Sequence, residues 1–180
     1  MEFDDFEYFV DQFEDIRVLK YQLPGFEFLT IQKKKLIYYL SQAALSGRDI
    51  LWDQNFRYNM MIRKAIEAIL DNYSGDKESA EYEAFLVYAK RVFFANGIHH
   101  HYSNDKLKPG FSASYFASLI DGTDRNYLPL SAGQTVEEFI SILADVIFDE
   151  KLFGRKVEQR KGADMVAESA VNFYENVNQK

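Results

Sequence analysis

The 180-residue sequence contains no cysteine. Disulfide bonds and thiolate zinc sites are therefore excluded, and any metal would have to be held by His, Asp or Glu. Positive charge is also scarce, because Lys and Arg together number 21 against 28 Asp and Glu, which gives a net charge of −7. Phosphate binding depends on clustered positive charge, so we expect no nucleic-acid partner.

Long hydrophobic runs are missing as well, since none approaches the roughly 18 uninterrupted apolar residues of a membrane-spanning helix. The first residues, Met1-Glu2-Phe3-Asp4-Asp5, are acidic where a secretory signal would be basic. We therefore expect a cytoplasmic protein without a membrane partner. Export by a leader that has been removed is the alternative left open.

The composition that remains, 47% hydrophobic and 27% charged, is typical of a soluble globular domain, and we expect one helical domain over residues 1–180. Apolar residues recur at helical spacing along most of the chain. The predicted fold is mainly α, with six or seven helices and one or two short strands or extended segments. Helices are expected near residues 4–15, 31–46, 61–72, 79–95, 115–120, 136–147 and 164–177, and an extended piece at 17–23.

Local signals mark several of these helix ends. Thr30 is a candidate cap of the helix near 31–46, and the pattern Thr135-Val136-Glu137-Glu138 matches a capping box. Asn96-Gly97 is a typical left-handed helix stop. In the helix near 31–46, the apolar residues Leu36, Ile37, Leu40, Ala43 and Ala44 are expected to form one face.

Two stretches lack a helical period. Residues 98–111 are polar and hold every histidine of the chain, so we predict an extended loop there. The basic stretch 151–161, which includes Arg155, Lys156 and Arg160, is interpreted as a solvated connector. Its docking to an acidic surface is the alternative.

The three histidines are consecutive, at His99, His100 and His101. In an extended backbone His99 and His101 point to the same side, and two imidazoles on one side can bind a divalent metal. A third ligand would still be needed, and Asp105 follows closely in the sequence. Three interpretations stay open: a polar loop that faces a substrate or partner, an ordinary packed or solvated loop, and a metal site.

Familiar catalytic motifs are missing. The sequence has no His-Glu-x-x-His pair, which would place two zinc ligands one helical turn apart with a general base between them. It also has no Gly-x-Ser-x-Gly elbow and no glycine-rich phosphate loop. We therefore predict no catalytic residue, no metal-ligand residue and no cofactor in this chain.

Several stretches nevertheless resemble a known family. The stretch EYEAFLVYA at residues 81–89, followed by Asn96-Gly97 and by DKLKP at 105–109, is similar to the amino-terminal region of dipeptidyl peptidase III. The stretches at 10–21, 24–26, 38–44 and 46–50 resemble the bacterial branch of that family in particular. Because these stretches keep the same order and matching spacing, the resemblance spans nearly the whole chain.

The resemblance implies a two-lobed zinc metallopeptidase, a hydrolase of the aminopeptidase kind that removes dipeptides from the amino terminus of oligopeptides. In that family the zinc ligands and the general base lie on a His-Glu-x-x-Gly-His-type motif, well downstream of the segment resembled here. Carried over by position, the resemblance implies that His101, Tyr102, Ser103 and Asn104 bind substrate in the peptide cleft. The eukaryotic type has Ser and Phe where this sequence has His and Tyr. An aromatic at position 102 would line an apolar subsite, and extended backbone there would pair with the peptide as an added strand.

The partners implied are an oligopeptide substrate and a downstream catalytic lobe of the same protein, with zinc expected only in the full-length enzyme. Because the family continues for several hundred residues, we expect an amino-terminal fragment. Apolar surface meant for the missing part is expected to show as dye binding or self-association. The alternative function is a stand-alone helical module that holds a peptide or partner without cleaving it.

Overall fold

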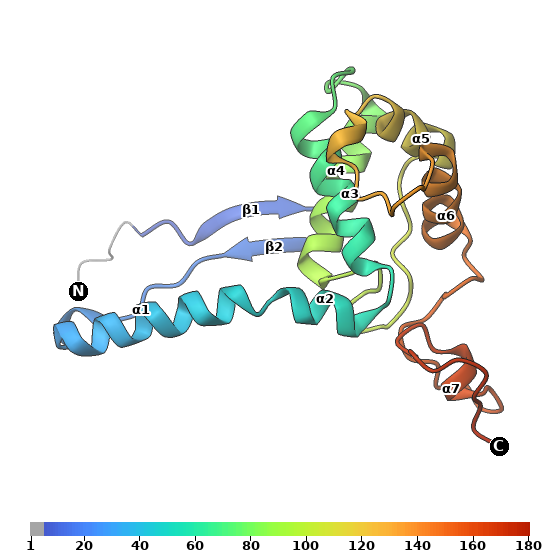
Figure 1. Cartoon of the computed structure of the whole chain (residues 1–180). Coiled ribbons are helices and arrows are strands. Elements are labelled where there is room, and N and C mark those ends of the chain that lie inside the picture. Colours follow the sequence, from blue (N-terminus) through green and yellow to red (C-terminus); the bar gives the residue numbers. More distant parts are fainter. Residues whose placement is uncertain (1–5) are drawn as a thin grey trace. The chain divides into compact units, whose positions relative to one another are not determined.

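The fold is mainly α in the computed structural model, which describes residues 6–180 (Figure 1). This described part contains six α-helices of at least seven residues, one shorter α-helix, two 3-10 helices and a two-stranded antiparallel sheet. The expected fold class is thereby confirmed. The chain forms two compact units, unit 1 up to Arg48 and unit 2 from Asp49 to Lys180. Within the described range, every helix is too short or too polar to cross a bilayer.

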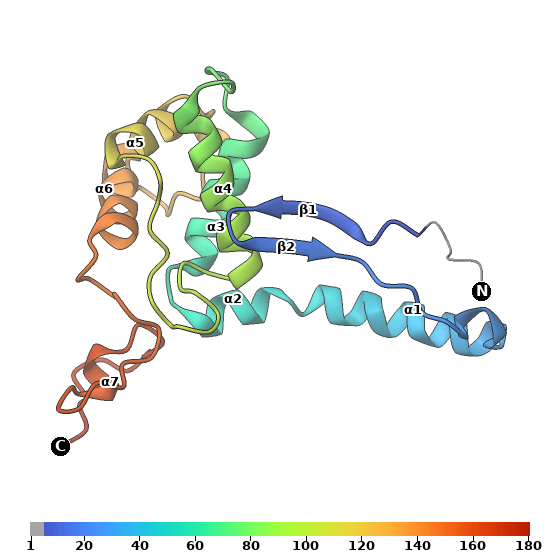
Figure 2. The same ribbon diagram turned by 180° about the vertical axis from the view of Figure 1, so that it is seen from behind.

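Unit 1 begins with a β-hairpin rather than with the helix expected near residues 4–15. Strand β1 (Phe9–Phe13) pairs antiparallel with β2 (Ile16–Leu19), and Glu14 makes the tight turn with a positive φ of 47° (Figure 2). The three- and four-residue spacing of apolar residues was misleading, because pairing with β2 satisfies the backbone of β1 across the hairpin. The expected extended piece is confirmed at β2. Asp4 and Asp5, which the expected helix included, lie outside the described residues.

The expected helix near 31–46 is confirmed as α1 (Ile31–Ser46), which follows the short 3-10 helix η1 (Phe26–Phe28). Thr30 caps it, because the hydroxyl oxygen of Thr30 accepts a hydrogen bond from the backbone N–H of Lys33. The apolar face expected on this helix is not covered. No residue of α1 is buried, and all sixteen are described.

Unit 2 is built around helix α3 (Asn59–Asn72), which packs against α2 (Asp49–Asn55), α4 (Ala80–Ala95) and α5 (Ala113–Asp121). Helix α5 also packs against α6 (Val136–Phe148), and the 3-10 helix η2 (Arg125–Tyr127) lies between them in sequence. Large apolar side chains from these helices form one core. Its fully buried members include Phe56, Ile62, Ile66, Ile69, Phe85, Phe116, Leu119, Ile120, Phe139, Leu143 and Ile147.

Side-chain caps explain why these helices begin where they do. The hydroxyls of Ser79 and Ser112 accept backbone N–H groups at the starts of α4 and α5. The predicted capping box is present at α6, where Thr135 and Glu138 each accept the other's backbone N–H. The predicted stop after α4 is also confirmed, because Asn96 is left-handed at φ 53°.

The helix expected over 164–177 is mostly wrong. Helix α7 spans only Met165–Glu168, and the carboxylate of Asp164 accepts two backbone N–H groups at its start. The chain then leaves the helix because the backbone N–H groups of Ala170 and Val171 bond to the 155–156 segment instead. A tertiary contact therefore overrides the local helical pattern.

Candidate functional site

The histidine stretch forms a small β-like hairpin on unit 2. The backbone N–H of Leu107 donates to the carbonyl of Ile98, and the N–H of His100 donates to the carbonyl of Asp105, both at 2.8 Å. These bonds flank an antiparallel bridge between His99 and Lys106. The expected extended loop is thus extended only at its two arms.

The tip of this hairpin, residues 101–104, is a tight turn. Asn104 adopts a left-handed φ of 65°, and its backbone N–H donates to the carbonyl of His100 at 3.1 Å. The ring atom Nδ1 of His100 accepts the backbone N–H groups of Tyr102 and Ser103, at 3.2 and 3.1 Å. The turn is therefore held by its own side chain, and the extended backbone expected around position 102 for strand addition is not present.

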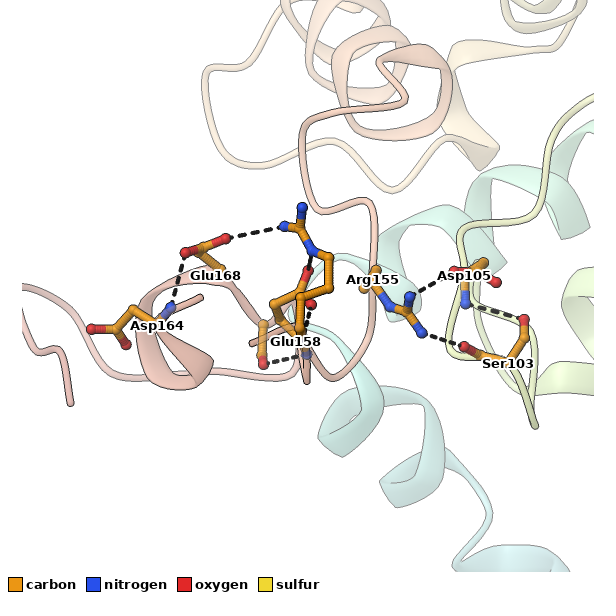
Figure 3. Close-up of polar contacts among 8 residues, drawn as sticks. Ser103, Asp105, Arg155, Glu158, Asp164 and Glu168 are labelled. Carbon is orange, nitrogen blue, oxygen red and sulfur yellow. Dashed lines mark hydrogen bonds and ion pairs between the residues drawn. The ribbon is translucent and has the colours of Figure 1, made fainter. Parts of the chain in front are cut away.

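The basic stretch 151–161 pairs with the hairpin and does not form the solvated connector that was expected. The backbone N–H of Lys106 donates to the carbonyl of Gly154 at 2.9 Å, and the N–H of Lys156 donates to the carbonyl of Asn104 at 2.8 Å. Between them, the guanidinium of Arg155 donates to the carbonyl of Ser103 at 2.9 Å and lies 3.6 Å from the Asp105 carboxylate (Figure 3). The basic stretch thus fixes one side of the hairpin.

A second ion-pair group holds the basic stretch itself. The side chain of Glu158 is buried and accepts from Arg160, whose guanidinium also reaches Glu168 in α7 at 3.3 Å (Figure 3). The backbone N–H of Arg160 also donates to the Glu158 carboxylate, and these interactions lower the Glu158 pKa below its usual value. Glu158 is therefore held as the carboxylate, which keeps the ion-pair group intact at neutral pH.

His99 points inward from the hairpin. Its side chain is 3% exposed, its Nε2 lies 2.8 Å from the carbonyl oxygen of Phe153, and its ring meets the Phe56 ring edge-on at 5.3 Å. Burial lowers the His99 pKa to about 4, although the bond to the Phe153 carbonyl acts in the opposite direction. His99 is therefore neutral at pH 7, with Nε2 carrying the proton that it donates.

The other end of the hairpin is anchored by Asn59. The side-chain amide of this buried residue donates to the carbonyl of Trp52, and its oxygen accepts the backbone N–H of Ile98 at 3.2 Å. Gly97 lies so close that a Cβ there would sit 2.2 Å from the Asn59 amide nitrogen, and its φ is +148°. A glycine is therefore required at this point of the chain.

Lys106 joins the hairpin to the end of α6. Its ammonium donates to the carbonyls of Val146 and Asp149, at 2.8 and 2.6 Å, and also to that of Leu152. The carbonyls of Val146 and Asp149 are backbone acceptors at the end of α6, and a cation there is favoured by the helix dipole. Burial lowers the Lys106 pKa, while Asp149 and Glu150 act against that change.

What the hairpin presents to solvent is a group of rings. The rings of His101 and Tyr102 lie 4.2 Å apart, those of His100 and His101 4.5 Å apart, and Phe94 at the end of α4 meets His101 edge-on at 5.1 Å. Tyr102 is 83% exposed. We call these four residues the ring surface. Ring faces bind apolar side chains and attract cations within about 6 Å.

The structure brings the predicted site residues together, since His101, Tyr102, Ser103 and Asn104 form one turn. Their roles differ: His101 and Tyr102 present rings, whereas the carbonyls of Ser103 and Asn104 are taken by the basic stretch. His99 and His101 were expected on one side, but the first is buried and the second is exposed. Across residues 6–180, no group of three or more His, Asp or Glu side chains is placed to hold a metal ion.

Three residues that form or hold the candidate site were not predicted from the sequence. Phe94 was expected only as part of a helix, Arg155 as part of a solvated stretch, and Asn59 was not singled out. Each acts through a partner 7 to 52 positions away along the chain. The only local signal was the pair Asn96-Gly97, which marks the place where the chain must turn beside Asn59. Neither a scan of protein-family models nor a search of curated proteins gave a match to this chain.

Proposed function

We propose that this chain is the amino-terminal part of a zinc-dependent dipeptidyl peptidase III, which removes dipeptides from the amino terminus of oligopeptides. In this proposal the chain supplies helical scaffold and part of the peptide-binding cleft. The catalytic zinc and its bound water belong to a downstream lobe of the same protein. The proposal is supported by the ordered stretches of sequence that resemble this family.

One structural observation carries the binding role, namely that the ring surface is exposed on a hairpin fixed at both ends. Asn59 holds its first arm and Lys106 holds its second, so the rings of His101 and Tyr102 are presented by a well-anchored backbone. Pre-organised rings lose little conformational entropy when a ligand binds. An oligopeptide offers both an amino-terminal ammonium and apolar side chains, and both suit ring faces.

A peptide that binds at this turn would have to be recognised by side chains of the chain and not by its backbone. The backbone carbonyls of Ser103 and Asn104 already accept hydrogen bonds from Arg155 and Lys156, so they are occupied by the protein itself. A peptide would therefore contact the rings rather than add a strand at the turn. This also explains why His and Tyr at positions 101 and 102 are compatible with peptide binding, although the eukaryotic type has Ser and Phe there.

The binding role is tested by titrating an oligopeptide with a free amino terminus into the purified chain in a calorimeter. The double variant His101→Ala/Tyr102→Ala is expected to weaken binding at least tenfold, which is about 1.4 kcal/mol. The control is Tyr127→Ala, which removes another exposed tyrosine, from η2, and is expected to change nothing. Equal affinity of the double variant and the unchanged chain would rule out the ring surface.

A stand-alone helical binding module is the second candidate. It is favoured by one observation: the bonds of Asn59, Lys106 and Arg155 that fix the hairpin lie within unit 2 itself, so presentation of the rings needs no further chain. The two candidate functions predict different gene sequences after the codon of Lys180. An open frame past Lys180 that reaches a His-Glu-x-x-Gly-His motif supports the peptidase, whereas a stop codon at that point supports the module.

A further inference from the structure

Helix α1 is apolar on two opposite sides. Leu36 and Leu40 mark one side, and Tyr38 lies between them in sequence, where a two-residue step turns the helix by about 200°. Tyr38 therefore points away from both leucines, and so do Ile31 and Leu45, which lie seven residues before and after it. A helix that is apolar on two sides needs a neighbour on each.

The side formed by Ile31, Tyr38 and Leu45, which we call the tyrosine stripe, is accessible along its whole length. These three side chains are 61%, 59% and 56% exposed, and the ring of Tyr39 leans edge-on against Tyr38 at 5.3 Å. Polar residues lie between the members of the stripe, with Lys34 and Lys35 between Ile31 and Tyr38, and Ser41 and Gln42 between Tyr38 and Leu45. The opposite side is interrupted by Lys33, one turn before Leu36.

The tyrosine stripe is self-complementary under a two-fold axis. Tyr38 lies midway between Ile31 and Leu45, so an antiparallel copy of the helix would place Tyr38 against Tyr38 and each Ile31 against Leu45 of the other copy. Two-fold contacts of this kind, in which both copies use the same patch, are the commonest in homo-oligomers. We infer that α1 is a dimerisation helix, which packs antiparallel on α1 of a second copy of this chain through the tyrosine stripe.

Charge favours the antiparallel direction. Lys33, Lys34 and Lys35 are the only charged residues of α1, and all three lie in its first turn and a half. A parallel pair would bring six lysines together, whereas an antiparallel pair brings each lysine group to the carboxyl end of the other helix. That end carries the partial negative charge of the helix dipole, so cations are stabilised there.

The apolar area that two copies of α1 can bury determines how strong the dimer is expected to be. Phe28, just before the helix, is 85% exposed, and together with the stripe and Tyr39 it displays roughly 600 Å² of apolar side chain per copy. Covering this on both copies would bury roughly 1,200 Å² in total, the low end of specific interfaces. The dimer is therefore expected to be weak and to dissociate on dilution. This inference does not rest on the proposed function.

Mass in solution gives the first test. In sedimentation equilibrium the purified chain is expected to approach twice its 21.0 kDa mass as concentration rises. The variant Tyr38→Lys should stay at 21.0 kDa at every concentration, with unchanged helix content by circular dichroism. The control Tyr127→Lys, on unit 2, should still dimerise. A chain that remains monomeric at all concentrations, or a Tyr38→Lys chain that still dimerises, overturns the inference.

The antiparallel direction of the two helices is tested by disulfide cross-linking. Because the sequence has no cysteine of its own, only the introduced cysteines can react. Positions 31 and 45 lie about 21 Å apart along the helix, well beyond the about 7 Å that a disulfide can span. In an antiparallel pair, Ile31→Cys and Leu45→Cys chains therefore cross-link when mixed but not when each is alone, and Tyr38→Cys cross-links with itself. Cross-linking of Ile31→Cys alone above the background of a Tyr127→Cys control would show a parallel pair and contradict the inference.

Discussion

The side-chain oxygen of Asn59 accepts the backbone N–H of Ile98 at 3.2 Å, and both residues are buried. This bond ties the middle of unit 2 to the first arm of the histidine hairpin, because Asn59 opens α3 and its amide also donates to the carbonyl of Trp52. This buried amide is therefore one of the anchors that position the ring surface.

Replacement of Asn59 by Ala is expected to lower the free energy of unfolding by about 1–3 kcal/mol, because the backbone N–H of Ile98 is left buried without its partner. Urea unfolding followed by fluorescence measures this well, since Trp52 is the only tryptophan and is buried in unit 2. The control is Asn126→Ala on the exposed helix η2, where a change under about 0.5 kcal/mol is expected. Equal losses in the two variants would contradict the anchoring role.

His99 makes the stability of unit 2 depend on pH. Its pKa is about 4 in the folded chain and near 6.5 when unfolded, so between these values the unfolded chain binds a proton that the folded chain does not. Stability is therefore complete above pH 6.5 and falls as the pH drops toward 4. A shift of this size corresponds to roughly 3 kcal/mol.

The variant His99→Gln isolates this effect, because glutamine retains an N–H donor for the Phe153 carbonyl but does not titrate. The difference in unfolding free energy between the two chains is expected to change by roughly 3 kcal/mol between pH 6.5 and 4, with the His99 chain losing more. His101→Gln, an exposed change in the same turn, supplies the comparison. Parallel curves for the unchanged and His99→Gln chains would refute the buried neutral imidazole.

Lys106 is expected to stabilise unit 2 by capping α6. Lys106→Met keeps most of the aliphatic side chain but removes the ammonium that donates to the carbonyls of Val146 and Asp149. We expect a loss of about 1–3 kcal/mol in urea unfolding. Lys108→Met is the matched control, because the ion pair of Lys108 with Glu150 is exposed and worth about 0.2–1 kcal/mol. A loss no larger than that of the control would show that the cap contributes little.

Loss of the Arg155 guanidinium is expected to loosen the turn rather than unfold unit 2. Arg155→Met removes the bond to the Ser103 carbonyl and the ion pair with Asp105, while the backbone bonds of the neighbouring Gly154 and Lys156 remain. Amide hydrogen exchange of residues 101–104 should become at least several-fold faster, with the α3 amides unchanged. Unaltered exchange in the turn would indicate that backbone bonds alone hold it.

Much of unit 2 could be predicted from the sequence, because its helices carry local signals. Thr135 and Glu138 mark the start of α6 by side chains three residues apart, and Asn96 marks the end of α4 in the same local way. Such signals act within one helical turn. The apolar stripe of α6 follows from them directly, with Phe139 and Leu143 buried as the period requires.

Where partners are distant in sequence, the sequence was a poorer guide. Phe6, Val10 and Phe13 match a helical spacing, yet the backbone of β1 pairs with β2 and forms a hairpin instead. The helix after Asp164 ends early because Ala170 bonds to the carbonyl of Arg155. Neither pairing can be inferred from the local pattern of residues.

The candidate site was likewise predictable only in part. Its location at 101–104 came from the family resemblance, and the structure gathers those residues in one turn. Which histidine faces inward could not be predicted, because the alternation expected of a strand ends at the turn that Asn104 makes. His99 is buried by Phe56 and Phe153, which lie far from it along the chain.

The proposed function requires that this chain bind a peptide at the ring surface without cleaving it. The most direct measurement is a titration of an unlabelled oligopeptide into the isotope-labelled chain by NMR, with zinc present and the peptide signals recorded in the same sample. The account predicts chemical-shift changes centred on His101 and Tyr102, with the peptide intact after prolonged incubation. Shift changes elsewhere only, or release of dipeptides that a chelator stops, would contradict it.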